Sequence, residues 1–127
     1  MAGRGVHVAI KRAYEAPAPG DGTRVLVDRL WPRGLSKERA RVDLWLKDVA
    51  PSTQLRMWYG HDPAKFATFR ERYMHELEAE PGHAALEELR DLARKGPVTL
   101  IFGARDVAHS EATVLRDMLA HPASVWP

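Results

Sequence analysis

Three short runs of apolar residues stand out along the chain and predict β-strands. In the first, Val6, Val8 and Ile10 alternate with other residues, the period of two that is typical of a strand with one buried face. The second run covers Val25 to Asp28. The third, Val98–Phe102, is apolar almost throughout, which favours a strand covered on both faces. We therefore expect a small sheet built from these three runs.

Signals for the starts and ends of helices fill the region between the second and third strands. A helix is predicted to begin at Ser52 or Thr53, whose hydroxyl groups accept hydrogen bonds from the amides of a first turn. The same helix is expected to run to about Tyr59 and to end at Gly60. Asp62-Pro63 predicts another start, with Asp as the cap and Pro in the first helical position.

Apolar residues three or four positions apart mark the buried faces of three longer helices. Gly96-Pro97 is expected to end the second of these three helices. Ser36, earlier in the chain, is expected to begin a separate short helical turn. The predicted buried residues are Phe66, Phe69, Tyr73 and Leu77, then Leu86, Leu89 and Leu92, and finally Val114, Leu115, Met118 and Leu119 in a last helix that begins near Ser110.

The order of these elements predicts a small layered α/β domain that takes in the whole chain, residues 1–127. We expect a three-stranded, partly parallel sheet flanked by about five helices. Residues 13–23, which hold two prolines and two glycines, are expected to form a loop without room for a regular helix. The first two strands are therefore joined either by a wide hairpin or by an irregular crossover.

Charged residues follow two of the predicted strands, and this is the strongest functional signal in the sequence. Ligands of α/β proteins bind beyond the carboxyl ends of the strands. Arginine holds carboxylate or phosphate groups in a two-pronged hydrogen-bonded geometry. We therefore expect a pocket for an anion at this edge of the sheet. Its predicted ligand-binding residues are Arg29, Trp31, Arg33, Arg105 and Ser110.

The residues predicted to carry out acid–base chemistry in this pocket are Asp28, Asp106 and His109. Facing carboxylates shift each other's pKa, and a histidine ionises near neutral pH. The alternative is structural: Arg29 pairs with Asp106 and Arg105 with Asp28, or Asp28 fixes a turn and Asp106 caps the last helix. The sequence carries no cofactor fingerprint and no recognisable metal motif, so neither a cofactor nor a metal is expected.

The amino-acid composition limits the chemistry and the cellular location that we expect for this protein. The chain has no cysteine, which excludes disulfides, thiol catalysis and cysteine-bound zinc. No segment is long and apolar enough for a bilayer, and a cytoplasmic protein is expected. The net charge of +2 is unevenly distributed, with nine Lys or Arg against four Asp or Glu in residues 1–41. Clustered positive charge attracts anionic partners.

The run Asp28-Arg29-Leu30-Trp31-Pro32-Arg33-Gly34 resembles the YeaO-like family of bacterial proteins, a domain of unknown function. The likeness extends over residues 6 to 120 and includes Pro51 to Arg56, Phe69 to Tyr73 and Ala104-Arg105-Asp106 with His109. It implies a compact cytoplasmic α/β domain without an established activity. More distant relatives carry cysteines after the last strand, where this chain has none, so thiol chemistry does not transfer to it.

Three functional hypotheses follow. The first is an enzyme or binding protein for an anionic small molecule, held at the strand ends. The second is a nucleic-acid-binding protein that uses the basic N-terminal third, with Trp31 stacking on unpaired bases. The third is a non-catalytic interaction module, in which the charged residues stabilise the fold and a homo-oligomer.

Overall fold

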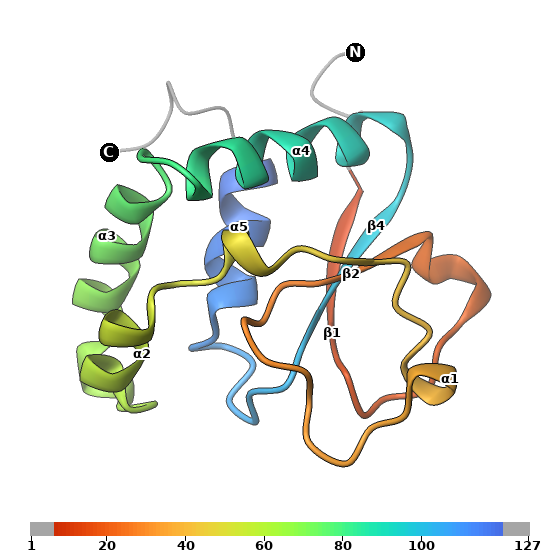
Figure 1. Cartoon of the computed structure of the whole chain (residues 1–127), viewed down its shortest axis with the longest axis horizontal. Coiled ribbons are helices and arrows are strands. Elements are labelled where there is room, and N and C mark those ends of the chain that lie inside the picture. The colour runs from red at the N-terminus through yellow and green to blue at the C-terminus, as the bar shows by residue number, and fades with distance from the viewer. Residues whose placement is uncertain (1–6, 121–127) are drawn as a thin grey trace.

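The computed structural model describes residues 7–120 and contains a four-stranded parallel sheet (Figure 1). Its strands are β1 (Val8–Arg12), β2 (Thr23–Leu26), β3 (Leu44–Trp45) and β4 (Val98–Phe102), in the spatial order β1-β4-β2-β3. All three neighbouring pairs run parallel. The α/β prediction is confirmed. The sheet differs from it by one strand, because the two residues of β3 extend the edge beside β2.

The helices begin and end close to the predicted residues. Ser52 accepts a hydrogen bond from the amide of Leu55, and Gly60 ends the same helix in the left-handed conformation. Asp62 caps a short 3-10 turn that leads directly into the next helix. The helices are α1 (Lys37–Ala40), α2 (Thr53–Tyr59), α3 (Phe66–Glu76), α4 (Gly82–Lys95) and α5 (Glu111–Ala120), with 3-10 turns η2 (Pro19–Asp21), η3 (Lys47–Val49) and η4 (Pro63–Lys65).

The connection from β1 to β2 is a crossover without an α-helix. Since both strands are parallel to β4, the intervening residues 13–22 carry the chain back to the starting edge of the sheet. Buried Asp21 anchors this segment by accepting hydrogen bonds from Lys11 at 2.9 Å and from Arg24 at 2.5 Å. The crossover is therefore stabilised by a buried ion-pair network in place of a packed helix.

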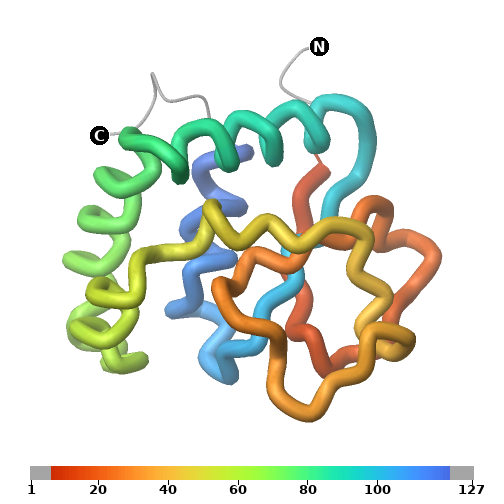
Figure 2. The backbone as a smooth tube through the Cα atoms, in the orientation of Figure 1, coloured from red at the N-terminus to blue at the C-terminus, as the bar shows by residue number. Residues whose placement is uncertain are grey.

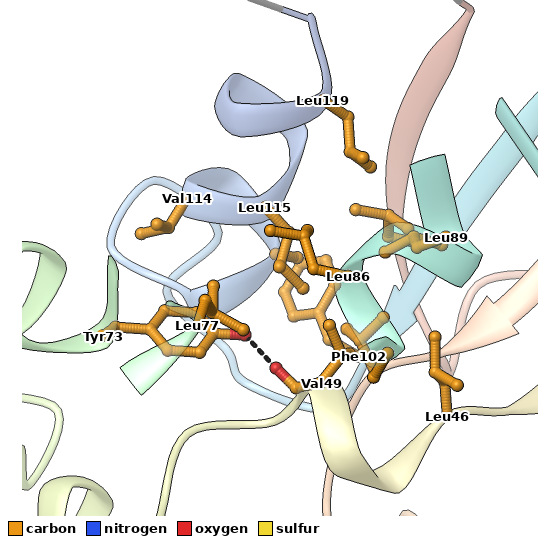
Figure 3. Close-up of a cluster of buried hydrophobic side chains, with 14 of the residues drawn as sticks. Leu46, Val49, Tyr73, Leu77, Leu86, Leu89, Phe102, Val114, Leu115 and Leu119 are labelled. Atoms are coloured by element: carbon orange, nitrogen blue, oxygen red, sulfur yellow. Dashed lines mark hydrogen bonds between the residues drawn. The ribbon is translucent and has the colours of Figure 1, made fainter. Parts of the chain in front are cut away.

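The two faces of the sheet are covered differently (Figure 2). Val25, Leu100 and Phe102 face a large core built with α2 to α5, in which buried Tyr73 donates a hydrogen bond to the carbonyl of Val49 (Figure 3). Alternate strand residues, among them Leu26 and Ile101, face a smaller cluster covered by loops and half-buried aromatic residues. No helix within residues 7–120 is long and apolar enough to cross a membrane.

Candidate functional site

A pocket of about 130 Å³ lies beyond the carboxyl end of β4. Helices α2 and α3, the segment after β4 and the start of α5 surround it. Its lining residues combine an arginine, two histidines and a glutamate with apolar and aromatic side chains. They are Pro51, Arg56, Met57, Tyr59, His61, Phe69, Ala104, His109, Ser110 and Glu111.

Helix α2 is held firmly beside this pocket. Ser52, at its start, donates its hydroxyl hydrogen to Glu76 of α3 at 2.6 Å, and its amide also donates to that carboxylate at 2.8 Å. At the other end, the hydroxyl of Tyr59 donates to the carbonyl of His109 at 2.6 Å, and the Tyr59 ring stacks on Phe69. These contacts fix the wall that carries Arg56 relative to the segment after β4.

Two carboxyl groups, Asp28 and Glu111, lie together beneath the pocket. Asp28 follows β2 and accepts a hydrogen bond from the amide of Gly103, at the end of β4, at 2.9 Å. Glu111 opens α5, and its Oε2 atom is buried without a hydrogen-bond donor from the residues that the structure describes. The side chains of Asp28 and Glu111 interact directly, so a proton on either carboxyl group allows a hydrogen bond between them.

The protonation of this pair follows from its surroundings. Burial raises the pKa of Glu111 well above its usual value, and the negative charge of Asp28 raises it further. The nearby guanidinium of Arg56 offsets part of this rise. Burial also raises the pKa of Asp28, although the hydrogen bond from Gly103 opposes this effect. Both carboxyl groups therefore hold a proton more strongly than they do in water, and the upward shift is the larger at Glu111.

Asp106 and His109 form a second polar unit at the rim. Nδ1 of His109 lies 2.8 Å from Oδ2 of Asp106, and the backbone amide of His109 donates to the same carboxylate at 3.3 Å. The imidazole also meets the edge of the Phe66 ring. The carboxylate thus orients the histidine, which itself lines the pocket. The predicted Asp28 lies apart from this unit, beside Glu111.

The predicted arginine clamp does not form around this pocket, because each of its members is placed elsewhere. Arg29 donates to the carbonyls of Ala50 at 3.0 Å and Pro51 at 3.3 Å, in the segment that precedes α2. Arg33 and Arg105 are exposed and are absent from the lining. The alternative pairing of Arg29 with Asp106 and of Arg105 with Asp28 is also not observed among residues 7–120.

Trp31 and Ser110 have structural roles in this arrangement. Trp31 packs edge-on against Trp45 in the smaller cluster, and its indole N–H donates to the carbonyl of Leu35. It is therefore absent from the pocket lining. Ser110 does line the pocket, but it is buried, and its hydroxyl donates to the carbonyl of Val107 at 2.8 Å.

Of the lining residues with polar side chains, the sequence analysis did not single out Arg56, Tyr59, His61 and Glu111 as site residues. Glu111 had a recognisable signal, because it directly follows Ser110 at the predicted start of the last helix and beyond the end of a strand. Arg56 and Tyr59 lie in α2, and the sequence of this helix does not show how it packs against the sheet. In the described part of the chain no three His, Asp or Glu residues form a group suited to a metal ion.

The fold and site define a parallel α/β domain with a small pocket of mixed polar and apolar lining beyond the end of β4. Residues 7–124 match the model of a family described as the "Inactive DUF488-N3 subclade". An uncharacterized protein of Mycobacterium tuberculosis is 48% identical over 116 residues, covering 91% of this chain and 96% of the relative. The uncharacterized protein YeaO of Escherichia coli is 40% identical over 114 residues, covering 90% and 97%. The chain therefore belongs to the YeaO-like DUF488 family. No solved structure matches it.

Proposed function

We propose that the pocket between α2, α3 and α5 binds a small carboxylate, with Arg56 as the residue that recognises its charge. Arg56 lines the pocket from α2 and forms no salt bridge with any carboxylate in residues 7–120. A guanidinium that is not held in a salt bridge presents a planar set of donors that matches a carboxylate. The position of the Arg56 guanidinium in the pocket lining is the observation that carries the proposal.

The charge around Arg56 favours a ligand with a single negative charge. Asp28 and Glu111 lie close enough to Arg56 for its positive charge to lower the pKa of both carboxyl groups, and Arg29 also lowers that of Glu111. A carboxylate ligand balances the single positive charge that Arg56 places at the pocket.

The volume of the pocket limits the ligand to a few heavy atoms. A protein cavity of about 150 Å³ accommodates benzene, which has six carbon atoms. The present pocket, at about 130 Å³, therefore suits a carboxylic acid of three or four carbons. Met57, Phe69 and Ala104 supply apolar surface for the carbon chain.

Binding is favoured over catalysis. The matching family model is described as inactive, which supports a domain that keeps its pocket without turning over a substrate. The chain also has no cysteine, and the hydroxyl of Ser110 is engaged with a backbone carbonyl. The Asp106–His109 pair is the group best suited to acid–base chemistry and remains the basis of an enzymatic alternative.

Calorimetric titration with propionate tests this function directly. Wild-type protein is expected to bind propionate, and Arg56→Met to weaken binding by about tenfold to a hundredfold, because a hydrogen bond to a charged group contributes about 1.5–3 kcal/mol. Arg105→Met, which removes an exposed arginine from outside the pocket, serves as the matched control and is expected to leave binding unchanged. Equal losses in both variants, or no binding by the wild type, would refute the assignment.

Nucleic-acid binding is less well supported. Exposed Arg33, Lys37, Arg39 and Arg41 form a basic segment around α1 that suits a polyanion. The indole of Trp31, however, is packed against Trp45 and bonded to Leu35, so it is not presented for stacking on a base. The pocket is therefore the preferred site.

A further inference from the structure

The segment after β4 brings a second polar side chain, that of His109, to the pocket that Arg56 lines. Arg56 and Tyr59 are three positions apart in α2, so they lie on the same side of the helix. The hydroxyl of Tyr59 donates to the carbonyl of His109 at 2.6 Å and holds the backbone of His109 against α2. A ligand that meets the guanidinium is therefore expected to lie within reach of the imidazole.

The imidazole of His109 is held in one orientation by its neighbours. Its Nδ1 atom lies 2.8 Å from Oδ2 of Asp106, and the ring also contacts the ring of Phe66 from α3. Since Asp106 engages Nδ1, Nε2 is the ring nitrogen that is left for a ligand.

Asp106 also determines which ring nitrogen carries hydrogen. A carboxylate only accepts hydrogen bonds, so the Nδ1 atom of His109 that contacts it carries a hydrogen. In a neutral imidazole the other nitrogen, Nε2, is then an acceptor, and it repels the oxygen atoms of a carboxylate ligand. In the imidazolium form Nε2 becomes a donor. The charge of His109 therefore decides whether the ring attracts or opposes a carboxylate.

We infer that His109 is the second contact of the bound carboxylate and that it binds this ligand in its imidazolium form. Arg56 donates to one carboxylate oxygen and Nε2 of His109 to the other, while Asp106 is the positioning residue that fixes the ring. When the ring is neutral beforehand, binding takes up one proton. This inference rests on the proposed function, because it requires the carboxylate to bind at Arg56.

Charged and titratable groups approach His109 from the elements around the pocket. They are Arg56 and Tyr59 of α2, His61 and Asp62 after it, Asp106 before α5, and Glu111 of α5 with Asp28 beneath it. The charge of Arg56 opposes an imidazolium, and that of Asp106 favours it. A bound carboxylate adds negative charge beside the ring and therefore favours the imidazolium form.

Calorimetric titration with propionate between pH 6 and pH 8 measures this coupling. Wild-type affinity is expected to fall by about tenfold over this range, because the imidazolium and its charge-assisted hydrogen bond are lost. His109→Gln, whose side chain does not change charge, is expected to bind propionate weakly at both pH values. His83→Gln, at an exposed position of α4 outside the pocket, is the matched control and is expected to keep the wild-type profile.

Asp106→Asn tests the positioning role. The asparagine amide can donate to Nδ1, so a neutral His109 ring can carry its hydrogen on Nε2 and donate to the ligand. The change in affinity between pH 6 and pH 8 is therefore expected to shrink to about threefold or less. Equal loss of affinity at both pH values would show that Asp106 has only a structural role.

Nuclear magnetic resonance of the histidine side chains gives a test that requires no variant. The pH midpoint of the His109 ring signals is expected to rise by about one unit in saturating propionate, the shift that corresponds to a tenfold preference for the imidazolium form. The ring signals of His83 are expected to keep their midpoint. Propionamide, which has the same shape as propionate but no charge, is expected to leave both midpoints unchanged.

The outcomes distinguish this inference from the proposed function. A pH profile shared by the wild type and His109→Gln, or a shift of the His61 midpoint in place of that of His109, would overturn the role of His109. Binding that is lost in Arg56→Met yet independent of pH in the wild type would also overturn it and leave the carboxylate pocket standing. Absence of propionate binding by the wild type at pH 6 would overturn the proposed function itself.

Discussion

At the scale of single residues, the pKa values of the carboxyl groups of Glu111 and Asp21 are shifted in opposite directions. Burial raises the pKa of Glu111 well above its usual value, and the nearby charges of Arg56 and Arg29 offset only part of this rise. Burial also raises the pKa of Asp21, but hydrogen bonds from Lys11, from the amide of Ala18 and from Arg24 outweigh it and lower the pKa overall. The hydrogen-bond donors that surround each carboxyl group therefore decide the direction of its shift.

The raised pKa of Glu111 predicts a specific dependence of stability on pH. In the unfolded chain Glu111 ionises near its ordinary pKa, whereas the folded protein keeps the proton to a higher pH. The folded state binds more protons between these two values, so its stability is greatest below the unfolded pKa and falls as pH rises toward the folded pKa. Glu111→Gln is expected to remove this fall.

Urea unfolding at several pH values between 5 and 8 measures the effect. The free energy of unfolding of Glu111→Gln, relative to wild type, is expected to increase steadily with pH. Glu88→Gln, at an exposed position of α4, is the matched control, and its difference from wild type is expected to stay constant. A pH-independent difference for Glu111→Gln would show that Glu111 is ionised in the folded protein.

Residue-level prediction from the sequence succeeded where a side chain acts locally. Ser52 and Gly60 were identified as the ends of α2 because capping depends on neighbouring amides and on backbone conformation. Arg29 was misplaced, since its partners are the carbonyls of Ala50 and Pro51, more than twenty positions away. The placement of an arginine after a strand does not reveal which carbonyls the fold will leave without donors.

At the scale of elements, the helix-free crossover from β1 to β2 depends on Gly22. This residue has a φ of 65°, and a Cβ atom built on it would lie 2.2 Å from the carbonyl oxygen of Pro97. That carbonyl already accepts a hydrogen bond from the amide of Thr23 at the start of β2. Close approach of the crossover to the segment before β4 therefore requires glycine.

Gly22→Ala is expected to destabilise the protein by at least about 2 kcal/mol, because it combines an unfavourable backbone conformation with a steric clash. Gly20→Ala, two positions earlier, meets no atom within 4 Å and serves as the control. Its effect is expected to stay within about 0.5 kcal/mol. Thermal and urea unfolding of the two variants give the comparison, and similar stability of both would contradict the proposed packing of the crossover.

The elements themselves were largely predictable, whereas their arrangement was not. Alternating and apolar runs located β1, β2 and β4, since burial imposes a period on the sequence. The strand β3 has two residues, too few for a period to appear. The insertion of β4 between β1 and β2 joins segments more than seventy residues apart, which local patterns do not report.

At the scale of the whole molecule, parallel strands bring the ends of β2 and β4 together and thereby create the site. The Asp28 side chain after β2 reaches the amide of Gly103 after β4, and Glu111 of α5 joins them. From the general behaviour of α/β folds, the sequence predicted a ligand site at this edge of the sheet, and that site stays a prediction. It did not indicate Arg56, because the docking of α2 against the sheet is determined by contacts with α3 and with the segment after β4.

The most direct test of the account is a nuclear magnetic resonance titration of the labelled protein with propionate, which reports where a ligand binds. The backbone amides of Tyr59, Ala104 and Glu111 are expected to shift together along one binding curve, and Arg56→Met is expected to abolish these shifts. Shifts confined to the basic segment 33–41, or shifts around Glu111 that persist unchanged in Arg56→Met, would contradict a carboxylate pocket at the strand ends.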